Sequence, residues 1–192
     1  RIMEKMKRDL GKTELLEVDT IGPIIGGELR TQALWALFWA TLLIMGYIAI
    51  RFELFYSVAG LAALYHDTLI TTGIVSLLWL EVDMAFIAAI LTIMGYSIND
   101  TIIIYDRVRE NVKKLDPRKH TFASIVSLSV NQTLPRSINT VLAVLFMNLM
   151  LLLFGGATIK TFALTLFMGF AIGAYSSIFL AAPLVVSWKR GR

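Results

Sequence analysis

One aspartate lies inside a long apolar run of the sequence, where an ionised carboxylate is costly. Asp100 falls in the stretch GYSINDTIIIYDRVREN at positions 95–111, within a run that begins near Met84. A charged carboxylate near the centre of a membrane-spanning helix costs about 3 kcal/mol on insertion scales, so such groups are rare and usually face protein or water. The chemistry that this placement predicts is the reversible binding of a proton.

Helical spacing gives Asp100 a polar face. Residues three, four and seven positions away lie on the same side of a helix, and Arg107 occupies the last of these positions. The other polar candidates of this stretch are Tyr96, Ser97, Asn99 and Asp106. A simpler interpretation is that Asp100 only pairs with Arg107 at the membrane edge.

Two more charges fall in apolar surroundings. Arg136 follows Pro135 in NQTLPRSINT, and because its guanidinium stays protonated, a buried Arg136 needs an acceptor, for which Asp100 is the strongest candidate. Alternatively, Arg136 extends to the cytoplasmic lipid surface. Pro135 is expected to mark a kink or a first helical turn. Asp67, which follows His66, belongs either to the proton path or to a local structural cluster.

A further motif, MGFAIGAYSS, spaces Gly169 and Gly173 four residues apart, and Ser177 continues the same small face. Such a face predicts close helix packing without chemistry. We find no nucleophile with a base, no phosphate-binding glycine loop and no cluster with metal-ligand spacing. The sequence therefore predicts a protein that is not an enzyme and that needs no cofactor and no metal.

The composition indicates which elements must hold these residues. The chain has 192 residues, of which 57% are hydrophobic and 17% charged, and its mean hydropathy is +0.71, which is typical of a membrane protein. The apolar runs are continuous, which favours helices over a barrel. They cover about 33–50, 54–80, 84–105, 138–154 and 162–188. We therefore predict an all-α, polytopic bundle of five transmembrane helices over residues 31–188.

The basic residues predict an orientation, because Lys and Arg gather in cytoplasmic loops. Arg51, the loop 107–130 and the tail 189–192 are then cytoplasmic, whereas residues 1–30 end an extracytoplasmic domain and enter the membrane. The six basic residues between the third and fourth runs are Arg107, Arg109, Lys113, Lys114, Arg118 and Lys119. The net charge of +4 is thus explained by topology and anionic lipid, and not by nucleic acid. The stretch FASIVSLSV predicts an interfacial helix leading into the fourth span, or a docking surface for a cytoplasmic motor.

The opening of the chain predicts that more sequence precedes it. The chain starts at Arg1 with a charged segment and has no basic and then apolar leader. We therefore expect this start to be an interior point of a longer protein.

Four separated motifs resemble one family. They are GYSINDTIIIYDRVREN, IGPIIGGELR at 21–30, SVNQTLPRSINT at 129–140 and GFAIGAYSSIFLAAP at 169–183. Together they resemble the SecD/SecF family of protein-export membrane subunits, SecF in particular, which is related to the resistance-nodulation-division transporters. The resemblance implies helices two to six of a six-helix subunit that lacks its first helix and most of its extracytoplasmic domain.

The same resemblance implies a function: preprotein export across the bacterial cytoplasmic (inner) membrane, assisted by the proton motive force. It ties proton conduction to Asp100 and Arg136, whereas a proline before that arginine is not expected in the family. The implied partners are SecD, the SecYEG channel, the SecA motor, YajC, preproteins and membrane lipids. Two alternatives are a proton-coupled transporter of small molecules or lipids, which the short outer loops disfavour, and a purely structural subunit of a translocation complex.

Overall fold

The computed structural model describes residues 23–116 and 118–190, and these residues form a bundle of long helices without strands. The elements are α2 (Pro23–Arg51), α3 (Leu54–Leu77), α4 (Met84–Lys114), α5 (Phe122–Phe154), α6 (Ala157–Ser176), the π-helical segment η1 (Ser177–Ala181) and α7 (Ala182–Arg190). Within the described residues, five helical segments are long and apolar enough to cross a membrane: Arg30–Arg51, Leu54–Leu77, Met84–Lys114, Phe122–Phe154 and Ile159–Lys189. The predicted fold class is confirmed.

Most of the segment at 1–30, predicted to end an extracytoplasmic domain, lies outside the described residues. Its last part, from Pro23 onward, belongs to α2. The last span is a single run in which α6, η1 and α7 follow one another without a gap.

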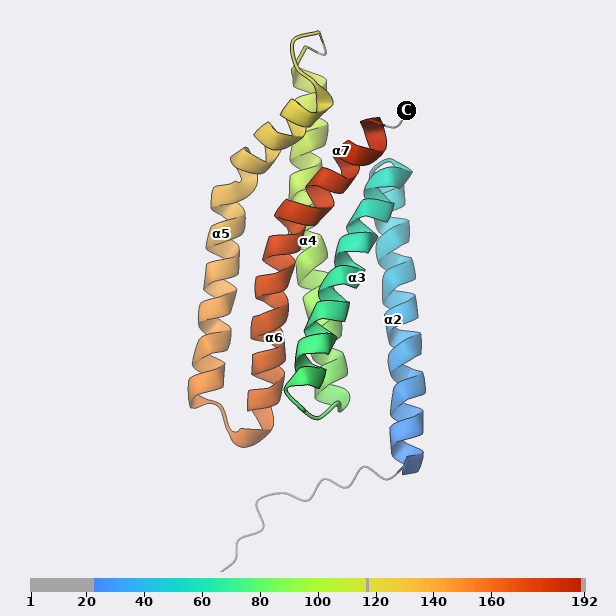
Figure 1. The fold of residues 1–192 in the computed structure, drawn as a ribbon, viewed down its shortest axis with the longest axis vertical. Coiled ribbons are helices and arrows are strands. Elements are labelled where there is room, and N and C mark those ends of the chain that lie inside the picture. The colour runs from blue at the N-terminus through green and yellow to red at the C-terminus, as the bar shows by residue number, and fades with distance from the viewer. Residues whose placement is uncertain (1–22, 117, 191–192) are drawn as a thin grey trace, which may run out of the picture.

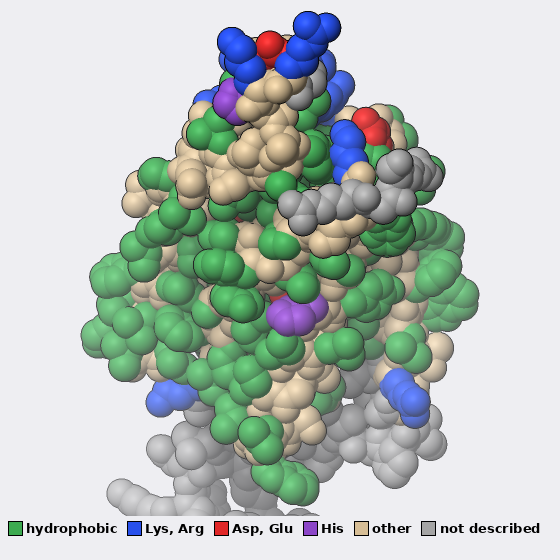
Figure 2. Space-filling model, turned by 45° about the horizontal axis from the view of Figure 1, so that its top comes forward, with side chains coloured by type: hydrophobic (Ala, Val, Ile, Leu, Met, Phe, Trp, Pro, Cys, Tyr) green, Lys and Arg blue, Asp and Glu red, His purple; other side chains and the backbone are tan. Residues whose placement is uncertain are grey.

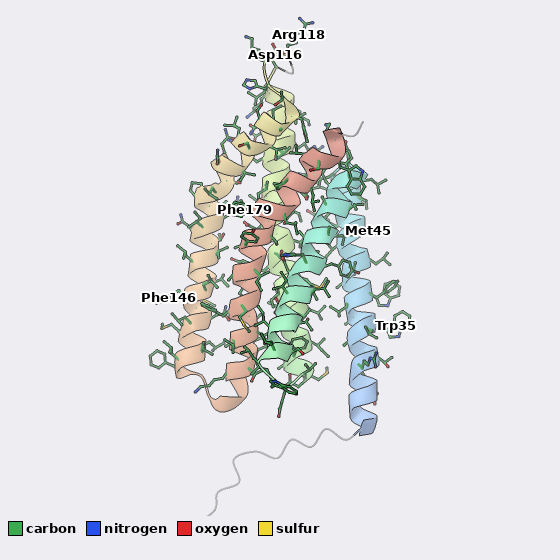
Figure 3. All side chains as sticks on the ribbon, in the orientation of Figure 1. Trp35, Met45, Asp116, Arg118, Phe146 and Phe179 are labelled. Atoms are coloured by element: carbon green, nitrogen blue, oxygen red, sulfur yellow. The ribbon has the colours of Figure 1, made fainter. Side chains whose placement is uncertain are left out.

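The helices form a bundle with α4 near its centre (Figure 1). In the most apolar window of α4, 56% of the residues are buried, against 6% in α2 and 17% in α5. Helices α2 and α5 flank the bundle, and their large side chains, such as Trp35 and Phe146, point away from it (Figure 3). Because most of this apolar surface is open, the fold needs lipid or a partner to cover it.

Basic side chains gather at one end of the bundle. Hydrophobic side chains cover its flank, whereas Lys and Arg gather at the tip where α4 and α5 meet (Figure 2). Asp116 and Arg118 lie at this tip (Figure 3). The junction of α2 with α3 and the end of α7 lie at the same end (Figure 1).

The helix of the fourth span is longer than the apolar run at 138–154. A single helix, α5, runs from Phe122 to Phe154 and contains Pro135 in its interior, so FASIVSLSV is helical and leads directly into the fourth span, as predicted. The reason is burial: Ile125 and Val126 are buried, which makes the amphipathic stretch a packed part of the helix. Pro135 is therefore not in a first turn, and the helix bends along its length (Figure 1), as a proline without an N–H donor requires.

Candidate functional site

Asp100 is buried on α4, where it faces α5. Its side chain is 4% exposed, and the Ser137 hydroxyl of α5 donates a hydrogen bond of 2.7 Å to its Oδ1. The other carboxylate oxygen, Oδ2, is buried without a partner. Because an unpartnered buried oxygen is costly, this carboxyl is suited to carry a proton or to attract a mobile donor.

Arg136 does not fill that role in this conformation. It is an exposed residue of α5, and no ion pair joins it to Asp100 among the described residues. Its neighbour Ser137 makes the contact instead. Arg136 lines a cavity of about 340 Å³ between α4 and α5, together with Asp106, Arg107, Glu110 and Gln132 among others. The guanidinium therefore lies one residue from the contact to Asp100, on a polar cavity.

The simpler interpretation, in which Asp100 pairs with Arg107, is wrong. Arg107 donates to Glu110 Oε2 and to Gln132 Oε1, each at 2.6 Å. Glu110 lies on the part of α4 that continues beyond the apolar run to Lys114, and Gln132 lies on α5. Asp106, another predicted candidate, pairs with Arg51 of α2 at 3.3 Å.

Two further candidates have different surroundings. Tyr96 donates from its hydroxyl to the Thr140 carbonyl of α5 at 3.0 Å, and its ring packs against that of Phe170. Asn99 is exposed on α4. The polar residues predicted near Asp100 thus have different neighbours: Tyr96 contacts α5, whereas Asn99 lies on the open surface of the bundle.

Asp67 forms a second polar centre, which joins three helices. Its side chain is 1% exposed. The hydroxyls of Ser97 on α4 and Ser176 on α6 donate to its Oδ2 at 2.6 and 2.7 Å. The ring of His66, which is partly exposed, lies with Nδ1 3.1 Å from the other oxygen, Oδ1. Ser97, predicted to lie on the same helix face as Asp100, therefore contacts Asp67 instead.

The hydroxyls of the last span were missed by sequence reasoning. Ser176 contacts Asp67, and Ser177 lies 3.0 Å from the Thr101 hydroxyl while also donating to the Gly173 carbonyl at 2.9 Å. The π-helical segment begins at Ser177, and such segments occur frequently at functional sites. The signal was present, because both serines continue the small face that starts at Gly169 and Gly173.

The two glycines let α6 approach α4 closely, as predicted. A Cβ at Gly169 would overlap the side chain of Ile93, and one at Gly173 would lie 3.1 Å from Ser97 Cβ. On the same face of α6, Ser176 lies within hydrogen-bonding distance of Asp67. Among the described residues, no group of three or more His, Cys, Asp or Glu side chains is placed to hold a metal ion.

Comparison with known proteins identifies relatives across nearly the whole chain. The family described as "Protein export membrane protein SecD/SecF, C-terminal" matches residues 2–191. A protein translocase subunit SecF from Sebaldella termitidis is 48% identical over 189 residues, which are 98% of this chain and 61% of that protein. A SecDF subunit from Thermus thermophilus is 46% identical over 94% of this chain and 24% of its own length.

Solved structures give the same result for the fold. The crystal structure of SecDF from Thermus thermophilus matches with a TM-score of 0.90 and 44% identity, over 98% of this chain and 26% of that one. A SecDF structure in a super-membrane-facing form matches with a TM-score of 0.84 and 40% identity, over 100% of this chain and 26% of that one. The chain thus spans about three fifths of the SecF relative and a quarter of SecDF.

Proposed function

The chain belongs to the SecD/SecF family of protein export membrane proteins, and from this premise we propose that it is the membrane part of a subunit that assists a Sec translocase. The names of its SecF and SecDF relatives support this role, as do five apolar spans. The partners that we propose are SecD, the SecYEG channel, SecA, YajC, preproteins and membrane lipids.

We also propose an orientation in the bacterial inner membrane. Basic residues at the end of the bundle that holds the α4–α5 tip support a cytoplasmic position for that end, because Lys and Arg are retained inside. The same end carries Arg51 and Lys189. The beginning of α2 then lies on the extracytoplasmic side, and α7 ends in the cytoplasm.

The coupling step that we propose is proton binding at Asp100. The observation that carries it is a buried carboxyl with one unpartnered oxygen. Its hydrogen-bond partner on α5, Ser137, is the neighbour of Arg136 in the chain. An ionised Asp100 attracts Arg136 out of its cavity, whereas a protonated Asp100 keeps only the hydroxyl of Ser137. Each protonation state thereby favours a different seating of α5 on α4.

The energies are of the right size for such a step. One elementary charge that moves through 100 mV releases about 2.3 kcal/mol, which is close to the cost of about 3 kcal/mol for a carboxylate inside a spanning helix. A single proton can therefore bias two packings of the bundle that differ by a few kcal/mol.

The test is Asp100→Asn in membrane vesicles that contain the partner subunit, with Asp116→Asn, at the α4–α5 tip, as the control. We expect Asp100→Asn to abolish the stimulation of preprotein export by a proton gradient, together with the associated proton flux. The control should retain both, because Asp116 is exposed and does not line the cavity that holds Arg136. Retention of export and flux in Asp100→Asn would remove this carboxyl from the mechanism.

A second variant separates proton coupling from a purely structural role. Arg136→Lys keeps the positive charge but loses the planar group that can bind a carboxylate with two hydrogen bonds. We expect gradient-driven export to fall while the complex with SecD still assembles. A complex that exports normally with this lysine would favour the structural subunit.

A further inference from the structure

The centre at Asp67 is separate from the one at Asp100. Asp67 connects α3 to α4 and α6 through Ser97 and Ser176, whereas Asp100 contacts α5 through Ser137. A buried carboxyl in the middle of a spanning helix is costly when charged. Asp67 also lies well away from both ends of α3, which runs from Leu54 to Leu77.

The hydrogen bonds around Asp67 can be satisfied in both of its protonation states. The Ser176 hydroxyl lies 2.7 Å from Asp67 Oδ2 and 3.1 Å from the carbonyl of Gly173. When Asp67 is ionised, Ser176 donates to it. When Asp67 is protonated, the acid donates to Ser176 Oγ, and the serine hydrogen turns to the Gly173 carbonyl. A hydrogen bond that only held the helices together would need only one of these two hydrogen-bond patterns.

We propose that Asp67 is a second proton-binding site, in which the Ser176 hydroxyl reverses its hydrogen bond when the proton arrives. His66 connects the site with the outside of the bundle, because its ring is 31% exposed and touches Asp67 Oδ1. The role of this proton in export rests on the function proposed above, whereas its binding does not.

Few other ionisable groups surround the site. Among the described residues, His66 is the one titratable side chain that is hydrogen-bonded to Asp67. On α4, Tyr96 precedes Ser97 and is turned to α5, and Asp100 lies one turn further along. On α6, Tyr175 precedes Ser176 and is exposed.

The outer helices complete this environment. α2 has no charged side chain between Arg30 and Arg51, and α5 carries Arg136 on its open cavity. A proton on Asp67 therefore changes the local charge without a compensating ion nearby, other than the histidine.

Reversal of the Ser176 hydrogen bond directly affects the π-helical segment η1. The Gly173 carbonyl that would accept from Ser176 already accepts from Ser177 at 2.9 Å. Ser177 has two other partners within reach, the Ser97 carbonyl at 3.3 Å and the Thr101 hydroxyl at 3.0 Å. Proton binding at Asp67 thus redistributes hydrogen bonds at the junction of α6 with η1, where the helix already departs from the α form.

The experiment is infrared difference spectroscopy between high and low pH on membranes that contain the protein with its export partners. A buried carboxylic acid gives a carbonyl band that is absent from the carboxylate, and aspartate labelled with ¹³C identifies the band by its shift. We expect Asp67→Asn to remove one titrating band, and Asp100→Asn to leave that band in place. A spectrum that Asp67→Asn does not change would overturn the proposal.

A second variant covers the case in which Asp67→Asn does not fold. Ser176→Ala keeps the acid but removes the hydroxyl that reverses, so the Asp67 band should move to higher frequency as its hydrogen bond is lost. Ser187→Ala, on an exposed serine of α7 that bonds only to the Pro183 carbonyl, is the matched control and should leave the band unmoved. An unmoved band in Ser176→Ala would also overturn the proposal. If Asp67→Asn removes the band while Asp100→Asn exports normally, the proton site at Asp67 stands and only the function proposed for Asp100 is refuted.

Discussion

Adding one methyl group at Gly169 should push α6 away from α4. The added Cβ would overlap Cδ1, Cγ1 and Cγ2 of Ile93 on α4. Isoleucine is branched at Cβ and is stiff at χ1 in a helix, so no single rotamer change clears all three atoms. Ile93 is 1% exposed and has no free space to enter. The helices must therefore move apart, or the side chain must leave its rotamer.

The expected cost follows from these contacts. Overpacking a filled core by a methyl group typically costs about 1–3 kcal/mol, whereas glycine to alanine inside a helix gains up to about 1 kcal/mol. Gly73→Ala on α3 is the control, because a Cβ there meets nothing within 4 Å. We expect Gly169→Ala to be about 1–3 kcal/mol less stable than this control.

Reversible unfolding of the purified protein in mixed micelles measures this difference in free energy. Ile93→Ala removes all three overlapping atoms, so the double variant should be more stable than the sum of the single effects, by about 0.5–3 kcal/mol. Export should fall in Gly169→Ala, because Ser176 lies on the helix that moves. Equal stability of Gly169→Ala and Gly73→Ala would refute the argument from close packing.

Three other substitutions test the surrounding structure. Asp83→Ala removes the carboxylate that caps α4 by accepting from the Phe86 N–H at 2.8 Å, and should lower the free energy of unfolding by about 1 kcal/mol. Asn111→Ala removes two hydrogen bonds from α4 to α5 and should cost about 2 kcal/mol in the same assay. Pro135→Ala restores a backbone donor inside α5, so the helix should straighten and gradient-driven export should fall without loss of stability; unchanged export would show that the bend is dispensable.

Hydropathy predicted the number and place of the spans, because about 20 apolar residues are needed to cross the hydrocarbon core. It did not predict where the helices end. The third apolar run stops near Tyr105, yet α4 continues to Lys114, since its cytoplasmic part is held by contacts such as those of Asn111 with α5. Apolar content indicates which residues cross the membrane, whereas a helix continues wherever packing and capping support it.

The sequence also could not decide which residue of α5 faces Asp100. Arg136 and Ser137 are neighbours, so their side chains point about 100° apart around the helix. A rotation of α5 by that amount exchanges one for the other, and this rotation depends on the bend at Pro135 and on packing against α4 and α6. Opposite charges suggested Arg136, but the observed contact belongs to the smaller Ser137.

The placement of the two buried carboxyls determines which helix can couple them. Ser97 and Asp100 are three residues apart on α4, so they point about 60° apart around its axis and contact different neighbours. A shift of α5 alone alters Asp100 and leaves the Asp67 centre intact. Among the described helices, α6 packs against α3, α4 and α5 and carries Ser176. A displacement of α6 along α4 therefore changes the contacts of Asp67 and also moves the surface against which α5 packs. For this reason α6 is the helix that can couple proton binding at one carboxyl to the other.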